Sequence, residues 1–435
     1  MTAEGVSNTD AARYSAEWWQ QYLANDRDEA FWRSWTRDLI RTMKTTPAVD
    51  QRQELKNYAD WVGSTLKQAN ADPVLLAACA NEFARVAKTL GASGDDTDVI
   101  AALNDAIQLV RTVGKPTTKL YRALAACHGS ERNEDSNRKS ALESAIEGLK
   151  PGSSGWADVM LDLSQYYTDI SQYDNALNVI AEIRDKLPAD MLARRYECGA
   201  SVYEGYVKIS SMRDLVGAEG DLERALTYEA GASRDVDLAM WVSMAYYRKG
   251  RLAQMRHDHP EAVSNYLKAE EVRGRWPRDP RTFAFIHLRI AEALTASGKL
   301  GEAKQHLDRS DDLFRACSDK GTGRIQYCVA LAAYEVANGD VDAGIETLRR
   351  TRADAREIGF HRGEALCAGQ LAMLYARRGQ LQSAAGAFYD LARTGLDGEL
   401  GRNGTARLLR KLPTLVKAFS IKTNVRSSES PAEKS

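Results

Sequence analysis

Three consecutive helical hairpins between residues 281 and 393 constrain this chain more than any other feature of its sequence. Each hairpin has an apolar first helix, a short turn with a glycine and an amphipathic second helix. The turn glycines are Gly298, Gly339 and Gly379. Each second helix carries its apolar residues on one face at helical spacing. A lone hairpin would leave that face in water, so the hairpins must stack on one another.

A small residue stands five positions after each turn glycine. These residues are Ala303, Gly344 and Ala384, which lie 41 and 40 residues apart. We expect the two helices of a pair to cross there, because only a small side chain lets two backbones approach closely. The pattern continues upstream at Ala262, Ala225, Ala176, Ala141 and Ala102. A period near 40 predicts a solenoid, whose helix-turn-helix units have roughly 34 to 47 residues.

The pattern inside each unit resembles the tetratricopeptide repeat. In the last unit the resemblance depends on Ala372, Tyr375, Gly379, Ala384 and Phe388. The stretch EIGFHRGEALCAGQLAMLYARRGQL is similar to the long-repeat subclass, with units of about 40 residues, found in kinesin light chains, polarity adaptors and bacterial peptide-sensing regulators. The resemblance covers about residues 73 to 393. It implies an all-α fold, a right-handed α-solenoid with N- and C-terminal capping helices, but no particular activity.

This resemblance and the composition of the linkers divide the chain into six segments. They are a disordered N-terminus at 1–8, a Trp-rich helical cap at 9–72, degenerate hairpins at 73–230, regular hairpins at 231–400, a C-terminal capping helix at 401–420 and a disordered tail at 421–435. The longest unit is 189–230, where we expect an insertion or an extended helix, with an irregular connection around Gly217 and Gly220.

The first 61 residues hold five of the eight tryptophans. Tryptophan fills cores and also anchors interfaces. The cap therefore either closes the first repeat or offers an aromatic docking surface, and a membrane-interface anchor is a third reading. The residues of the possible docking surface are Trp18, Trp19, Trp32 and Trp35.

Charge and composition argue against several classes of function. The chain has 59 basic and 60 acidic residues, so no global field favours nucleic acid or an acidic partner. No apolar run is long enough to span a membrane, and the N-terminus lacks the pattern of a secretory signal. The six cysteines form no CxxC pair and mostly stand among Ala and Leu, which predicts buried thiols. We therefore expect a cytoplasmic protein.

We identify no catalytic, cofactor-binding or metal-binding residues in the sequence. It contains no GxSxG, HExxH, GxxxxGK[ST] or GxGxxG motif. His257 and His259 flank Asp258 in HDHP, a composition that can bind metal. However, this stretch precedes a helix and has Pro260 at its start, which favours helix capping. We therefore predict that the protein is not an enzyme and needs no cofactor.

The register of the first helices predicts which side chains line the inner groove of the superhelix. Chaperone-binding relatives hold a terminal carboxylate there with Lys, Arg and Asn, whereas these positions offer Leu, Val, Met and few cations, so that ligand is not expected. The predicted groove residues are Leu161, Gln165, Asp169, Phe285, Leu288, Glu292, Thr295, Val329, Ala333, Val336, Met373 and Arg377.

These observations favour a non-enzymatic adaptor or scaffold that binds a segment of a partner protein, or a peptide, in the groove. The alternative is a regulatory protein that responds to a peptide or other ligand and acts on a partner. The N-terminal helices lack a short basic recognition helix, so we expect no binding to nucleic acid. An enzyme or enzyme accessory stays open as a third reading, because catalytic groups can converge from distant helices. The oligomeric state is undetermined by the sequence.

Overall fold

The computed structural model describes residues 97–397, except 113, 129–134, 275–279 and 317–320, together with residues 80, 81, 84 and 87. The predicted N-terminal cap, with the possible docking surface of Trp18, Trp19, Trp32 and Trp35, lies outside the described residues, as do the predicted capping helix at 401–420 and both predicted disordered ends.

Helices account for all of the regular structure in the described part. The first half contains α5 (Thr97–Thr112), α6 (Thr118–Cys127), α7 (Asp135–Ile146), α8 (Ser154–Asp169), α9 (Tyr173–Lys186), α10 (Ala189–Met191), the π-helical η1 (Leu192–Tyr196), α11 (Glu197–Ser211), α12 (Leu215–Leu226) and the 3-10 helix η2 (Glu229–Ser233). The second half contains α13 (Val236–Met255), α14 (His259–Gly274), α15 (Pro280–Ala296), α16 (Leu300–Ala316), α17 (Thr322–Ala337), α18 (Val341–Glu357), α19 (His361–Arg377) and α20 (Leu381–Asp397).

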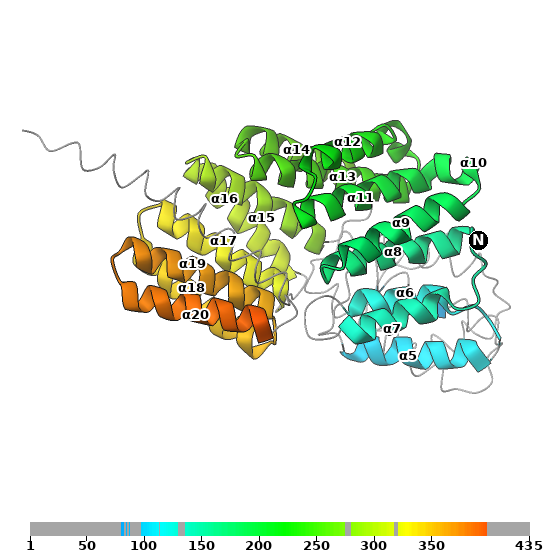
Figure 1. Cartoon of the computed structure of the whole chain (residues 1–435), viewed down its shortest axis with the longest axis horizontal. Coiled ribbons are helices and arrows are strands. Elements are labelled where there is room, and N and C mark those ends of the chain that lie inside the picture. Colours follow the sequence, from blue (N-terminus) through cyan, green and yellow to red (C-terminus); the bar gives the residue numbers. More distant parts are fainter. Residues whose placement is uncertain are drawn as a thin grey trace, which may run out of the picture.

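Consecutive helices pack in pairs, and the pairs stack in chain order (Figure 1). Each pair has a first and a second helix. The pairs are α6–α7, α8–α9, α11–α12, α13–α14, α15–α16, α17–α18 and α19–α20. The predicted all-α solenoid of helix-turn-helix repeats is therefore confirmed.

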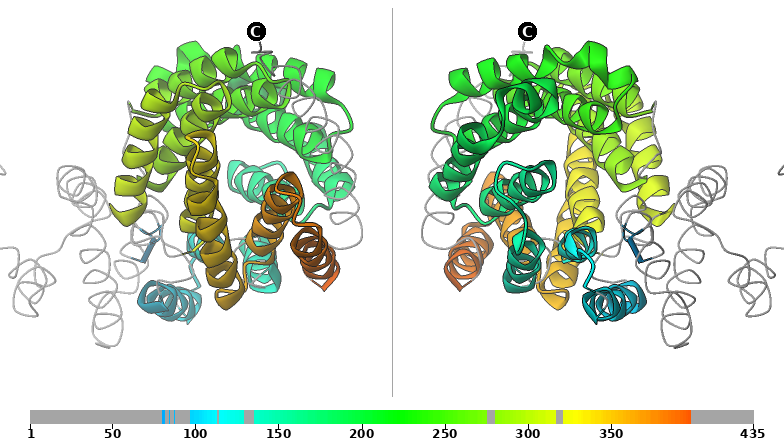
Figure 2. Two further views of the ribbon diagram at one scale, coloured as in Figure 1. Left: turned by 90° about the vertical axis from the view of Figure 1, so that its left-hand side faces the viewer. Right: turned by 90° about the vertical axis from the view of Figure 1, so that its right-hand side faces the viewer.

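The first helices form one side of a curved array. Neighbouring first helices contact one another, as in α8–α11, α11–α13, α15–α17 and α17–α19. Within the described ranges, the second helices of adjacent pairs have no contact of that extent. The array therefore curves with its first helices on the concave side, and it winds into the arch that Figure 2 shows.

The turn glycines end the first helices in the left-handed conformation that glycine adopts without strain. Gly298, Gly339 and Gly379 have φ of 77°, 98° and 71°. After each of them the chain closes a C-terminal cap, for example through Lys299 N–H donating to the Leu294 carbonyl at 2.9 Å. These positions set the length of the hairpins.

The small residues stand where paired helices cross. Ala303, Ala262 and Ala176 are fully buried. At Gly344, an added Cβ would meet Cγ2 of Val336 at 2.6 Å and the carbonyl oxygen of Ala332 at 3.0 Å. Both atoms belong to α17, the first helix of the same pair. The predicted reason for a small residue at this position, close approach of two helices, therefore agrees with the structure.

The long unit at 189–230 has an extended first helix. It begins at Ala189 and continues through the π-helical turn η1 into α11. The irregular connection predicted around Gly217 and Gly220 is wrong, because both glycines lie inside α12. Asp214 caps this helix by accepting from the Gly217 N–H at 2.7 Å, and a Cβ on Gly217 would collide with the same carboxylate. Gly217 thus permits a helix start and does not break the helix.

The described thiols are reduced and mostly buried. Cys127, Cys198 and Cys367 are buried and Cys328 is half-buried. Burial raises the pKa of Cys198 and of Cys367 to about 12, so neither is a nucleophile at neutral pH. None of the helices in the described part combines the length and apolarity that a membrane crossing needs.

Candidate partner-binding face

One side of each first helix contacts its own second helix, and the neighbouring side carries polar residues that reach across repeats. In α15, Leu288 is fully buried and packs in a core cluster with Phe314 of α16. The next residue, Arg289, donates from Nε to the Tyr247 hydroxyl of α13 at 3.2 Å and from Nη2 to Oε1 of Gln326 of α17 at 2.5 Å. A side chain that touches both neighbouring first helices lies on the concave side.

We call this surface the inner face. Its described members are Asp162, Gln165, Asp169, Tyr203, Tyr206, Tyr247, Arg248, Arg251, Arg289, Glu292 and Gln326.

Three arginines gather on the inner face around two tyrosines, and we call Arg248, Arg251, Arg289, Tyr206 and Tyr247 the arginine cluster. The Arg248 guanidinium lies 3.5 Å from the centre of the Tyr206 ring and 5.5 Å from that of Tyr247. Such stacking holds a guanidinium in place without neutralising its charge. The cluster joins α11, α13 and α15.

Only one of these guanidinium groups has a carboxylate partner. Arg289 Nη1 donates to both carboxylate oxygens of Glu292, at 2.6 and 2.8 Å. Arg251 makes no hydrogen bond or ion pair with any residue in the described part of the chain. Arg248 has a buried Nε that also lacks a hydrogen-bond partner there.

The electrostatics of the cluster show an excess of positive charge. Burial raises the pKa of the Tyr247 hydroxyl, but Arg289, Arg251 and Arg248 together bring it below its ordinary value. The charge of Arg289 lowers the pKa of Arg251, and burial lowers it further. A tyrosine pKa falls below normal in a desolvated place only where positive charge dominates.

Towards the N-terminal repeats the inner face is electrically balanced. Asp162 of α8 accepts from Arg122 Nε of α6 at 2.6 Å. Asp169 accepts from Arg138 Nη1 of α7 at 2.9 Å and from the Tyr206 hydroxyl at 2.9 Å. Each of these arginines has an acidic partner, in contrast to Arg248 and Arg251.

Most of the predicted groove residues are accessible, and some of them belong to the inner face. Ala333 and Arg377 are exposed, while the half-buried ones are Gln165, Asp169, Phe285, Glu292, Thr295, Val336 and Met373. Of these, Gln165, Asp169 and Glu292 join the inner face: Gln165, for example, accepts from the Tyr203 hydroxyl at 3.1 Å. Phe285 instead packs edge-on against Phe314 of α16, with ring centres 5.1 Å apart.

The expectation that Leu161, Leu288 and Val329 face an open groove is wrong. Their side chains are 2%, 0% and 6% exposed and belong to the cores between helices. The physical reason is that a leucine or valine in an amphipathic helix is drawn to the core face. In α8 and α15 the inner face begins one residue later, at Asp162 and Arg289, about 100° further around the helix.

The sequence reasoning missed the arginine cluster. Tyr247, Arg248 and Arg251 stand in MAYYRKGRLAQM, and Arg289 interrupts the apolar run FAFIHLRIAEAL. A charged residue inside an apolar helix, at the spacing of the neighbouring repeat, was the available signal. We expected few cations in the groove, and this expectation is wrong because Arg248, Arg251 and Arg289 lie on the inner face.

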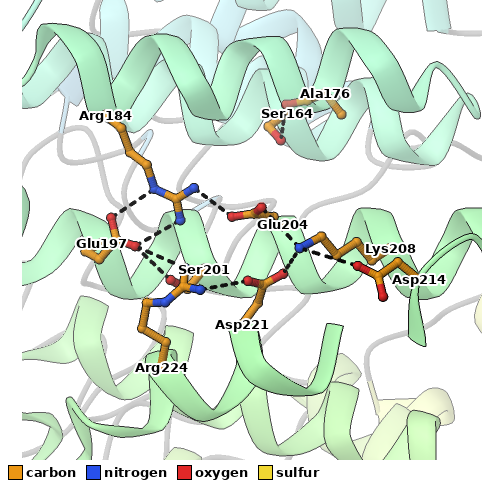
Figure 3. Close-up of polar contacts among 10 residues, drawn as sticks. All are labelled: Ser164, Ala176, Arg184, Glu197, Ser201, Glu204, Lys208, Asp214, Asp221 and Arg224. Atoms are coloured by element: carbon orange, nitrogen blue, oxygen red, sulfur yellow. Dashed lines mark hydrogen bonds and ion pairs between the residues drawn. The ribbon is translucent and has the colours of Figure 1, made fainter. Parts of the chain in front are cut away.

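A second set of charged residues, on the other side of α11, is fully paired (Figure 3). We call it the balanced network, and it consists of Arg184, Glu197, Glu204, Lys208, Asp221 and Arg224. Arg184 of α9 donates to Glu197 of α11 at 2.9 and 3.0 Å and to Glu204 at 2.6 Å.

The balanced network continues from α11 to α12. Lys208 lies 2.8 Å from Oδ2 of Asp221 and 3.3 Å from Glu204, and Arg224 lies 3.1 Å from Oδ1 of Asp221. Burial raises the pKa of Asp221, and Lys208 counteracts this. Each positive group of the network lies within ion-pair distance of at least one carboxylate, so the network links α9, α11 and α12.

Two histidines form another buried polar contact. Nδ1 of His287 in α15 lies 3.0 Å from Nδ1 of His306 in α16, and its Nε2 lies 3.5 Å from Glu270 of α14. Burial, with smaller effects of His306 and Arg309, lowers the pKa of His287 to about 4. Across the described ranges, no group of three or more His, Cys, Asp or Glu residues is arranged to hold a metal ion.

Comparison with known proteins supports the architecture. No family model matches the chain, and no curated protein matches it in sequence. Among solved structures, a Rap protein complexed with competence and sporulation factor aligns over 87% of this chain and 99% of its own, with 15% identity and a TM-score of 0.50.

Two further structures resemble the chain more distantly. Aspartyl phosphate phosphatase F from Bacillus subtilis aligns over 91% of this chain and 96% of its own, with 11% identity and a TM-score of 0.49. A tetratricopeptide repeat protein from Parabacteroides merdae aligns over 61% and 91%, with 15% identity and a TM-score of 0.36. Sequence identities of 11–15% are informative about the fold only, and not about function. The chain has the tetratricopeptide-repeat fold that its sequence pattern predicts.

Proposed function

We propose that this protein is a non-enzymatic adaptor that holds a segment of a partner protein, or a peptide, on the inner face of its superhelix. The observation that carries the proposal is the polar and aromatic inner face itself. Tyrosine and arginine are residue types that dominate binding energy at protein interfaces. Tyr206, Tyr247 and the three arginines of the inner face stay partly accessible, whereas most apolar residues of the first helices are buried in the cores. A Rap protein of the same fold has been solved with competence and sporulation factor bound.

The arrangement suits an extended or helical segment more than a small molecule. The inner-face residues are spread over α8, α11, α13, α15 and α17, so a ligand must be long to contact them all. Repeat proteins commonly use such continuous concave surfaces for recognition of chain segments.

Site-specific photo-crosslinking tests this proposal. A photoreactive residue replaces Ala333, which is exposed and two helical turns after Gln326 on α17, or Leu267, which is 45% exposed on the second helix α14. In extract of the source cells, we expect defined protein or peptide adducts from position 333 and none of them from position 267. Identical adducts from both positions would remove the inner face from the explanation.

A further inference from the structure

The arginine cluster has more positive charge than the protein itself neutralises. Arg248, Arg251 and Arg289 carry three positive charges, and Glu292 carries the negative charge that pairs with Arg289. The balance is therefore +2. Arginine keeps its proton at neutral pH, so this charge persists.

Desolvating an unpaired guanidinium is costly, and proteins rarely leave one near like charges. Arg251 makes no hydrogen bond or close ion pair in the described chain, and the repulsion by Arg289 outweighs the weaker attraction by Glu292. The Nε of Arg248 is buried and also lacks a partner there. Both groups are thus held ready for an acceptor that the described chain does not provide.

The known geometry of guanidinium groups indicates the acceptor. Arginine binds phosphate and carboxylate oxygens through paired N–H donors. A phosphorylated side chain carries about −1.5 to −2 charges at neutral pH, which matches the excess of +2, whereas a carboxylate carries half of that. The tyrosine rings of Tyr206 and Tyr247 border the site and hold Arg248 by stacking.

We propose that the arginine cluster is a subsite for a dianionic phosphoryl group on a phosphorylated side chain of the bound segment. Arg251 and Arg248 donate to the phosphoryl oxygens, while Arg289, fixed by Glu292 and Gln326, supplies the third positive charge. This subsite rests on the proposed function, since it lies on the inner face where the partner segment binds. It gives the adaptor a partner that is recognised only after phosphorylation.

Ligand-induced thermal shift of the full chain tests the subsite. Wild type, Arg251→Gln, Arg248→Gln and the control Arg350→Gln are titrated at one ionic strength with acetyl-phosphoserine amide, inorganic phosphate and acetyl-glutamate amide. Arg350 is 75% exposed on α18, so its replacement matches the loss of charge elsewhere. The unliganded Arg251→Gln variant should melt no lower than wild type, because it loses a repelled group.

We expect acetyl-phosphoserine amide to bind wild type and Arg350→Gln equally and to bind Arg251→Gln at least about tenfold more weakly, with Arg248→Gln also weakened, as for loss of a charge-assisted hydrogen bond. Equal affinity in all four proteins would overturn the subsite. Tighter binding of acetyl-glutamate amide would reassign it to a carboxylate, and tighter binding of inorganic phosphate would detach it from the partner segment.

Single-stranded RNA provides a separate outcome. If decauridylate binds wild type more tightly than acetyl-phosphoserine amide and loses this binding in Arg251→Gln, the phosphoryl group belongs to nucleic acid and the proposal is wrong. Crosslinking from position 333 does not require the arginine cluster. Adducts there without phosphoryl binding would leave the adaptor function intact and refute only the subsite.

Discussion

The balanced network and the arginine cluster lie on successive repeats but solve the problem of buried charge in opposite ways. In the first, Arg184, Lys208 and Arg224 each reach a carboxylate on another helix or turn. In the second, Arg251 and Arg248 have no such acceptor in the described chain. The comparison teaches that charged residues of this chain which pair across helices hold repeats together, whereas the unbalanced positive charge is the feature from which we propose a ligand subsite.

The largest effect should follow from breaking the balanced network. Glu197→Ala removes the acceptor of Arg184, Arg224 and Ser201 together. Because the half-buried Arg184 loses its two-point acceptor and keeps only Glu204, while Arg224 and Ser201 each lose one contact, we expect the free energy of unfolding to fall by about 2–3 kcal/mol in urea denaturation. Glu346→Ala, in an exposed pair, serves as control and should cost under about 0.5 kcal/mol. Equal costs would mean that the network contributes no stability.

The histidine pair is a third case of buried polar groups. Unlike the arginines, His287 can give up its proton at neutral pH, and it then carries no charge that would need a partner. The folded-state pKa of His287, about 4, is below its ordinary value of 6.5, so the unfolded chain binds the proton first. Stability from this group is therefore present above pH 6.5 and is lost as pH falls towards 4. Between pH 7 and pH 4.5 we expect a loss of about 2 kcal/mol that His287→Gln lacks.

The control for this pH dependence is His257→Asn, which changes an exposed histidine and keeps a residue that tolerates the positive φ of 64°. Its unfolding free energy should follow that of wild type with pH. A His287→Gln variant with the full wild-type loss would show that the pair does not control the acid response.

A smaller effect should follow from removing the one carboxylate of the arginine cluster. Glu292→Gln leaves Arg289 without its two-point acceptor, and we expect a loss of about 1–2 kcal/mol in unfolding free energy in chloride buffer. Phosphate should restore more stability to this variant than to wild type, because the charge excess has grown. A smaller phosphate effect in the variant than in wild type would contradict the charge balance assigned to the cluster.

The smallest effect should have the opposite sign. Arg251→Met keeps the apolar stem of the side chain and removes its repulsion by Arg289, so we expect unfolding free energy to rise by about 0.5 kcal/mol. The matched change in the balanced network, Arg184→Met, should lower it. If both replacements destabilise the protein by the same amount, the distinction between the two regions fails.

The fold could be predicted because each repeat encodes it redundantly. The turn glycines, the small residues at the helix crossings and the apolar stripe all specify the same hairpin, as Gly339, Gly344 and Ile345 illustrate. The unit with the irregularity, 189–230, was predicted correctly, but the irregular segment within it was not. Gly217 looks like a helix breaker in the sequence, and only the Asp214 cap shows that it lies inside a helix.

The candidate site was harder to predict because the same hydrophobic pattern describes only the core. An apolar residue such as Leu288 was placed on the groove, but its burial in the pair leaves Arg289 beside it on the inner face. Which side of a first helix faces its neighbours depends on the twist between repeats, and one residue of register changes the face. The electrostatic interaction between Arg251 and Arg289, which are 38 positions apart, cannot be predicted from spacing alone.

The buried thiols can serve as site-specific probes of local opening in this protein. Cys127, Cys198 and Cys367 lie in the first helices α6, α11 and α19, near the beginning, middle and end of the described array. An alkylating reagent can reach each sulfur only when its own repeat separates from the stack, since the folded state shields the thiol from solvent. Labelling kinetics resolved by position would therefore time, along one chain, where the superhelix loosens first.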